Sequence, residues 1–313
     1  MPRVLRAAAG VAAVGLLIGG CGFGSSQLGA AAFVGATVIP LEQVHGQLVA
    51  VLAKEGPQAR AELEAGHQLG DVSRKIVTVR IRHQLLEIAA RRAGLTVDQA
   101  QVNRLIKGVG GAETASKGTI FDAASYRQRA ADQLLMAALG RAVVRHSAVT
   151  VDYTTADTRT AAKQRVEELA QAGSTLARQS IEADVRAGKD AELGKRIVAA
   201  DDPIFATTPA FGAAEGTVVA FQLDDTKPWV IMVIKNRTDR GVQPSDHAPP
   251  VDQIDPAVLQ AIGLRQLARV AQEEGGVRLS PRYGVWDPAS LQAVSDENVT
   301  SGFVVPLRTT PRA

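Results

Sequence analysis

Apolar residues recur at every third or fourth position through most of the first half of the chain, which is the spacing of one helical face. The repeat is clear over residues 41–52, directly after Pro40, and strongest over residues 71–93. The second segment carries a broad apolar stripe with arginines on its other side, and Gly94 stands where a helix ends. We expect two helices here, and we expect the arginine-bearing face of the second to be solvated.

Two more helices are predicted before residue 147. Thr96 and Gln99 have the spacing of a capping box, which predicts that a short helix begins at Thr96. Residues 108–118 are rich in glycine and polar residues and are expected to form a loop. The apolar repeat then resumes over residues 122–146 and predicts another long helix.

The pattern changes after Ser147. Residues 149–153 alternate between β-branched and polar types and predict a strand, which two helical segments follow at 156–172 and 175–187. Residues 217–221 and 229–234 then predict two strands joined by a turn. A strand, helices and a closing antiparallel hairpin together predict a small α+β domain.

The last part of the chain predicts one more helix and an extended tail. Asp255 and Pro256 form a typical helix start, and the apolar face that follows has no neighbouring helix in the sequence. We therefore expect this helix to pack back on the N-terminal helices. The tail should form short extended segments in which Tyr283, Trp286 and Phe303 serve as packing anchors.

The N-terminus has the pattern of an export signal. Arg3 and Arg6 precede an uncharged run over residues 7–20, which is too short to span a bilayer comfortably. The run ends at Cys21 and resembles a bacterial lipobox, with Ile18 where leucine is usual. The resemblance implies lipidation of Cys21 and a protein anchored at the extracytoplasmic face of the plasma membrane. The alternative is a buried cysteine in an ordinary signal region.

Composition excludes several classes of protein. Of 313 residues, 46% are hydrophobic, which is enough for a substantial core. The 35 lysines and arginines exceed the 32 acidic residues by three, and this excess is too small to indicate a nucleic-acid partner. A single cysteine excludes a disulfide framework and a multi-cysteine zinc site.

The sequence offers no catalytic, cofactor or metal motif. It lacks the Gly-x-Ser-x-Gly and His-Glu-x-x-His patterns, and the glycines around residues 188–194 do not have phosphate-loop spacing. The histidines have no ligand spacing, so solvated or core positions are the preferred interpretation. They are His45, His67, His83, His146 and His247. We expect no cofactor and no metal.

The order of these parts resembles the exported chaperones of the SurA/PrsA type. The lipobox, the helix after Ile39-Pro40, the long helix over residues 71–93 and the run Thr96-Val97-Asp98-Gln99 match the N-terminal domain of that family. The run from Pro281 to Asp287 is similar to the tail of actinobacterial lipoproteins of this kind.

The middle of the chain resembles a parvulin-type prolyl isomerase domain inserted in the chaperone domain. Ala191-Glu192-Leu193-Gly194 is similar to the Gly-Asp-Leu-Gly turn of parvulins. The stretch from Phe211 to Val219 is similar to their Phe-x-x-x-x-Gly-x-Val step. The strand over residues 229–234 stands where the closing parvulin strand would be. The alternative is an unrelated small α+β domain.

The parvulin-like segment departs from the family at its catalytic positions. Parvulins use a pair of histidines with a nearby Cys or Asp, whereas no histidine or cysteine lies between Ser147 and Asp246. The expected histidine positions hold Asp152 or Tyr153 and Trp229. We therefore expect a catalytically inactive domain.

The expected fold is α+β, with a mostly helical chaperone domain of the SurA N-terminal type, completed by a C-terminal helix, and an inserted small parvulin-like domain. The predicted boundaries are a signal peptide at 1–20, a flexible linker at 21–30, the helical domain at 31–148, the degenerate parvulin-like domain at 149–240, a linker at 241–254 and the C-terminal helix and tail, packed on the N-terminal domain, at 255–313.

The expected function is that of a membrane-anchored chaperone that binds unfolded or partly folded secreted proteins without catalysis. An envelope scaffold or assembly adaptor is the alternative, and an active prolyl isomerase the second alternative. A chaperone must expose a contiguous apolar surface, whereas a scaffold with one partner need not. The candidate peptide-binding residues are Leu48, Leu52, Ile81, Leu85, Ile88, Leu134 and Leu135.

Overall fold

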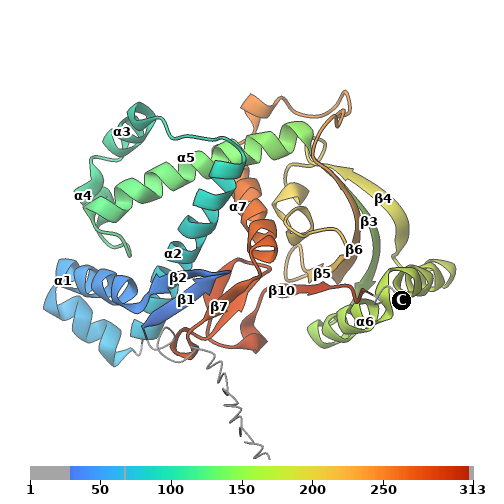
Figure 1. Ribbon diagram of the computed structural model, residues 1–313, viewed down its shortest axis with the longest axis horizontal. Helices are drawn as coiled ribbons and strands as arrows, with labels where there is room; N and C mark the ends of the chain where they lie inside the picture. The colour runs from blue at the N-terminus through green and yellow to red at the C-terminus, as the bar shows by residue number, and fades with distance from the viewer. Residues whose placement is uncertain (1–28, 67, 310–313) are drawn as a thin grey trace, which may run out of the picture.

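The computed structural model describes residues 29–66 and 68–309 and has the α+β fold expected, with 53% helix and 19% strand (Figure 1). The predicted signal peptide, Cys21 and most of the predicted linker lie outside the described residues. The linker ends earlier than predicted, because Ala30 is buried and begins a strand. No helix within the described residues is long and apolar enough to cross a membrane.

The N-terminal half consists of five helices beside a small sheet (Figure 1). The helices are α1 (Leu41–Ala65), α2 (Leu69–Arg92), α3 (Gln99–Gly108), α4 (Ala112–Ser116) and α5 (Ala123–His146). The sheet was not predicted, because its strand β1 (Ala30–Val34) consists mostly of alanine. β1 lies between β2 (Thr37–Pro40) and β7 (Val277–Leu279), so the two ends of the chain pair here.

The structure corrects three local predictions in this half. The α3 helix is capped by Asp98, whose carboxylate accepts a hydrogen bond from the Ala100 amide at 2.8 Å, and Thr96 is not the cap. The predicted loop at 108–118 contains α4. A reciprocal capping box occurs instead at the start of α5, between Asp122 and Ser125.

The arginine face of α2 is not uniformly solvated, contrary to the prediction. Arg82 is half-buried, and its guanidinium donates hydrogen bonds to the carbonyl oxygens of Leu291 at 2.8 Å and Ser290 at 3.1 Å. Burial, and then the charge of Arg265, lowers the pKa of Arg82 to about 10. This side of α2 therefore holds the C-terminal part of the chain in place.

The second half is built on a five-stranded antiparallel sheet with the order β10-β5-β6-β3-β4. Its strands are β3 (Ala148–Ala156), β4 (Glu192–Val198), β5 (Thr217–Phe221), β6 (Trp229–Thr238) and β10 (Gly302–Pro306). The predicted strand at 149–153 and the predicted hairpin are confirmed. The family resemblance predicts a turn at residues 191–194, but these residues lie at the start of strand β4.

Helix α6 (Arg159–Arg186) covers one face of this sheet. Its backbone leaves the helical conformation at Gly173, which has a φ of 73°, a value that glycine adopts readily. The helix therefore consists of two segments, as the sequence predicted. Short 3-10 turns at Phe205–Thr207 and Pro209–Phe211 lie between β4 and β5.

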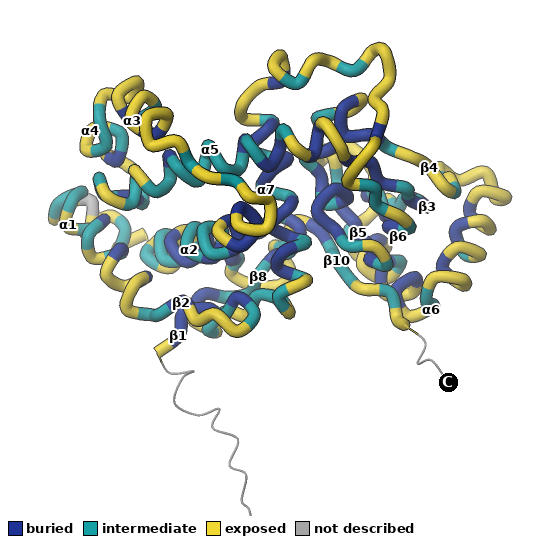
Figure 2. Tube along the Cα trace, turned by 45° about the horizontal axis from the view of Figure 1, so that its top comes forward, coloured by how far each residue is buried: buried dark blue, intermediate teal, exposed yellow. Residues whose placement is uncertain are grey.

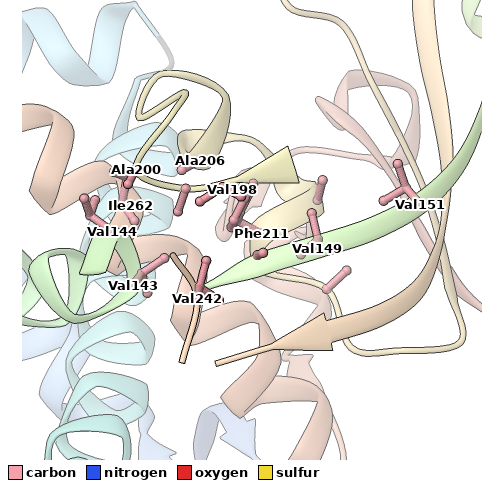
Figure 3. Close-up of a cluster of buried hydrophobic side chains, with 14 of the residues drawn as sticks. Val143, Val144, Val149, Val151, Val198, Ala200, Ala206, Phe211, Val242 and Ile262 are labelled. Carbon is pink, nitrogen blue, oxygen red and sulfur yellow. The ribbon is translucent and has the colours of Figure 1, made fainter. Parts of the chain in front are cut away.

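Helix α7 (Pro256–Glu273) lies between the helical half and the sheet (Figure 1). It packs along α5, contacts α2 and touches both 3-10 turns. Figure 3 shows the core that results, in which Val143 of α5 and Ile262 of α7 lie near Phe211 and Val149. This apolar cluster therefore contains residues from both halves, whereas the other clusters each lie within one half.

The tail divides between the two halves, which corrects its predicted placement on the N-terminal domain alone. β7 and the hairpin of β8 (Val285–Asp287) and β9 (Gln292–Val294) lie beside the N-terminal helices. β10 instead pairs with β5 and completes the five-stranded sheet. Tyr283 and Trp286 pack in the helical half, and Phe303 packs beside Trp229 in the sheet half.

Candidate functional site

Two adjoining hollows flank helix α1. One, of about 680 Å³, lies between the start of α1, the start of α2 and Tyr283. The other, of about 490 Å³, lies inside the bend that α1 makes at Gly56, where φ is 85°. His45, Leu48 and Leu69 line both hollows, so the two form one surface.

This surface is largely apolar because α1 has apolar residues on two sides, one that faces the core and one that remains partly exposed. Val44 and Val51 are buried against the rest of the molecule, whereas Leu48 and Leu52 are half-buried and Val49 is 50% exposed. Figure 2 shows the mainly intermediate and exposed positions along α1. The aliphatic side chains that line the hollows are Pro40, Leu41, Val44, Leu48, Val49, Leu52, Ala53, Pro57 and Leu69.

The seven candidate residues do not form one surface. Leu48 and Leu52 line the hollows at α1. Ile81 and Leu85 have no exposed surface, and Ile88 is only 8% exposed. These three are core residues, so their prediction as peptide-binding residues is wrong. Leu134 packs against the small cluster between α3 and α5, and Leu135 against the main helical core. Periodicity alone does not separate the core-facing side of a helix from an apolar side that remains open.

A separate pocket of about 400 Å³ lies between α2 and α5, with Gln260 of α7 and Gln292 of β9 at its margin. Its most notable pair is His83 and Asp132, whose Nδ1 and Oδ1 are 3.0 Å apart. Glu87 lies 3.4 Å from the other ring nitrogen of His83. Burial opposes protonation of the ring, but the hydrogen bond and charge of Asp132 outweigh it, so the pKa of His83 is raised above its usual 6.5.

Sequence reasoning did not identify this pair. His83 and Asp132 are separated by 49 positions and meet only because α2 and α5 pack side by side. The only local signal was the spacing of His83 and Glu87 four residues apart on one helix.

The positions expected to hold parvulin histidines have other roles in the sheet. Asp152 is fully buried and accepts a hydrogen bond from the Gly194 amide at 2.8 Å, with Arg178 at 3.3 Å. Trp229 is 5% exposed and packs against Phe303 on the α6 side.

Tyr153 lies on the face of the sheet opposite to α6, where it packs against the cluster that contains Phe211. Its partner across the β3–β6 ladder is Met232. Its hydroxyl donates a hydrogen bond to Asp190 at 3.0 Å. Tyr153 and Trp229 thus lie on opposite faces, and neither could serve as a hydrogen-bonded partner of the other.

Within residues 29–66 and 68–309, no group of three or more His, Cys, Asp or Glu side chains is placed to hold a metal ion. Compared with known proteins, the chain matches no protein-family model and no curated sequence.

Proposed function

We propose that this protein is a membrane-anchored extracytoplasmic chaperone, which binds unfolded or partly folded secreted polypeptides at the α1 hollows without catalysis. The apolar surface formed by the two adjoining hollows is the observation that carries this proposal. Burial of apolar area stabilises a complex by roughly 25 cal/mol per Å² and acts on any extended chain with apolar side chains. Such a surface therefore suits clients of diverse sequence.

Other exposed apolar residues do not gather in the same way. Leu176, Ile204 and Leu223 are each more than half exposed, but they lie on α6, before β5 and after β5, away from the hollows. Single exposed apolar side chains of this kind are ordinary on protein surfaces. This contrast favours the α1 surface as the place where clients bind.

The arrangement of the elements supports the family resemblance. The helices α1 to α5 are completed by α7 from the end of the chain, and the segment from β3 to β6 is inserted between them. That segment follows the order of strand, helix, strand, short turns and antiparallel hairpin. The extra strand β10, which the tail adds to the inserted sheet, is a departure from the expected pattern.

The proposed anchor would hold the hollows near the membrane. Gly29 lines the larger hollow and lies eight positions after Cys21. A fully extended chain covers at most about 3.5 Å per residue, so the hollow would lie within about 28 Å of the lipid surface. A client that emerges from the membrane would meet this surface early.

The proposal that no catalysis occurs rests on the side chains at the parvulin positions. Prolyl isomerisation has a barrier of roughly 18–20 kcal/mol, and a catalyst must favour the twisted amide over both planar forms. Asp152 is buried and its carboxylate is committed to the Gly194 amide and the Arg178 guanidinium, and Trp229 is a core residue with a single hydrogen-bond donor. Client binding makes no demand on these groups.

An aggregation assay tests the proposal. A chain that begins at residue 22 keeps every described element, and these elements pack on one another within residues 29–309. We expect this chain to suppress the aggregation of a denatured client protein on dilution. Val49→Glu with Leu52→Glu should reduce protection severalfold, because two carboxylates would then replace apolar side chains in the hollow, in addition to Glu64, which is paired with Arg60.

Leu176→Glu is the matched control, since Leu176 is 57% exposed on α6 and lies outside both hollows. Melting temperatures of all three proteins check that each variant is folded. Equal protection by the double variant and the parent would place client binding elsewhere. A complete lack of protection by the parent would favour the scaffold alternative.

A further inference from the structure

The pocket between α2 and α5 is distinct from the α1 hollows and has two kinds of lining. Leu86, Phe121 and Met136 provide apolar surface, and Lys75, Arg82 and Arg129 provide positive charge. Asp132 is the only carboxylate among its described lining residues, which gives a formal charge of +2 when His83 is neutral. With a volume of about 400 Å³, the pocket is large enough for a small organic molecule.

The positive charges in this pocket exceed the negative charge that its own lining residues provide. Asp132 is hydrogen-bonded to His83 through both of its oxygens, at 3.0 and 3.1 Å. Arg82 is committed to the backbone carbonyls of the tail. Neither Lys75 nor Arg129 forms an ion pair within the part of the chain that the structure describes.

Arg129 is held in place by aromatic rings. Its guanidinium carbon lies 5.0 Å from the centre of the Phe121 ring and 5.6 Å from that of Tyr126, which are cation–π distances. The same rings restrict the side chain while its N–H groups remain without a carboxylate partner. A guanidinium held in this way is prepared to bind a carboxylate through two parallel hydrogen bonds.

We infer that this pocket binds a small organic carboxylate that carries an apolar group. The carboxylate would lie against Arg129 and Lys75, and the apolar group against Leu86 and Met136. The chain terminus of a peptide and a free fatty acid both have this chemistry. Such a site is independent of the α1 hollows, because the two share no lining residue.

Titration calorimetry on the chain that begins at residue 22 tests this inference. The probes are N-acetyl-phenylalanyl-leucine, the same compound with its terminal carboxylate converted to an amide, and octanoate. We expect at least one of the two carboxylates to bind, and any binding of the amide to be at least tenfold weaker than that of its acid. Binding of the peptide acid alone identifies a chain terminus as the ligand, and binding of octanoate alone identifies a fatty acid.

Variants assign the binding to this pocket. Arg129→Gln should weaken binding of the carboxylate at least tenfold, and Lys75→Gln, at an exposed position without described polar contacts, should weaken it severalfold. Arg127→Gln is the matched control, because Arg127 is exposed on the same helix and bonds to Asn103 instead. The inference is overturned if neither carboxylate binds, if acid and amide bind equally, or if Lys75→Gln and Arg129→Gln bind like the parent.

Discussion

Gly140 of α5 faces Gly263 of α7 at the place where the two helices make their closest approach. A Cβ atom on Gly140 would lie 1.9 Å from the Leu259 carbonyl oxygen, and one on Gly263 would lie 1.9 Å from the Met136 carbonyl oxygen. The two backbones are therefore in direct contact. This contact sets the position of α7, on which the shared core of the two halves depends.

Gly140→Ala is expected to destabilise the protein by about 1–3 kcal/mol or more, because the new methyl group overlaps backbone atoms that cannot move aside without separating the helices. Gly263→Ala should have a similar effect. Urea denaturation of the chain that begins at residue 22 provides the measurement. Gly46→Ala is the control: its Cβ would meet no atom within 4 Å, so it should stabilise α1 by about 0.5–1 kcal/mol. Unchanged stability in both core variants would contradict the close crossing.

Removal of β10 should expose the edge of the sheet. All five residues of β5 are buried, and β10 covers the open side of that strand. A chain that ends at Ser301 is expected to aggregate, because an unpaired apolar edge strand readily pairs with another chain. A chain that ends at Thr309 keeps β10 and should remain monomeric. Size-exclusion chromatography separates the two outcomes, and a monomeric, equally stable protein without β10 would show that this pairing is dispensable.

The His83–Asp132 pair should make the stability depend on pH. Because the pKa of His83 is raised in the folded state, protonation stabilises the fold. This contribution is complete below about pH 6.5, the pKa of histidine in an unfolded chain, and is lost as the pH rises through the folded-state value. His83→Gln should therefore cost more stability at pH 5.5 than at pH 8.5, as urea denaturation at the two pH values would measure.

Asp132→Asn checks the cause of that dependence. The carboxylate of Asp132 favours the protonated ring, against the opposing effects of burial and Arg80. Replacement of Asp132 by asparagine should remove most of the extra stability that the protonated His83 ring provides at low pH. An equal loss of stability at both pH values in both variants would show that the pair acts by packing alone.

The segment from β3 to β6 should not accelerate prolyl isomerisation. A protease-coupled assay with a proline-containing peptide is expected to give the uncatalysed rate, because the side chains at the expected catalytic positions are committed to structural contacts. Tyr153→Phe is the informative variant, since it removes only the hydroxyl. An acceleration above the uncatalysed rate that disappears in Tyr153→Phe would show an unusual active site.

Cys21 is predicted to carry the membrane anchor. Cys21→Ser should leave the protein unprocessed or released from the membrane, because the thiol would be the acceptor of the lipid. Fractionation of cells that produce each form, with mass spectrometry of the N-terminal peptide, provides the measurement. A serine variant that remains in the membrane fraction as fully as the parent would rule out lipidation at this residue.

The sequence by itself determined the elements whose signals are local. The periodicity of residues 71–93 and 122–146 located α2 and α5. The segments predicted at 156–172 and 175–187 correspond to the two parts of α6, which the structure separates at Gly173, where φ is positive. The Asp255–Pro256 start located α7. Of the seven candidate contact residues, Leu48 and Leu52 lie on the predicted helix α1, and the structure places them in the hollows.

Only the tertiary structure decided which surfaces meet. Ile81 and Leu85 have the same apolar spacing as Leu48, but α2 is covered on that side and α1 is not. The alanine-rich β1 becomes a strand because β7, more than 240 positions away, pairs with it. His83 meets Asp132, and Arg82 meets the tail, through packing between distant segments. Periodicity is a property of neighbouring residues, whereas burial, ion pairing and strand partners depend on segments that are far apart in the chain.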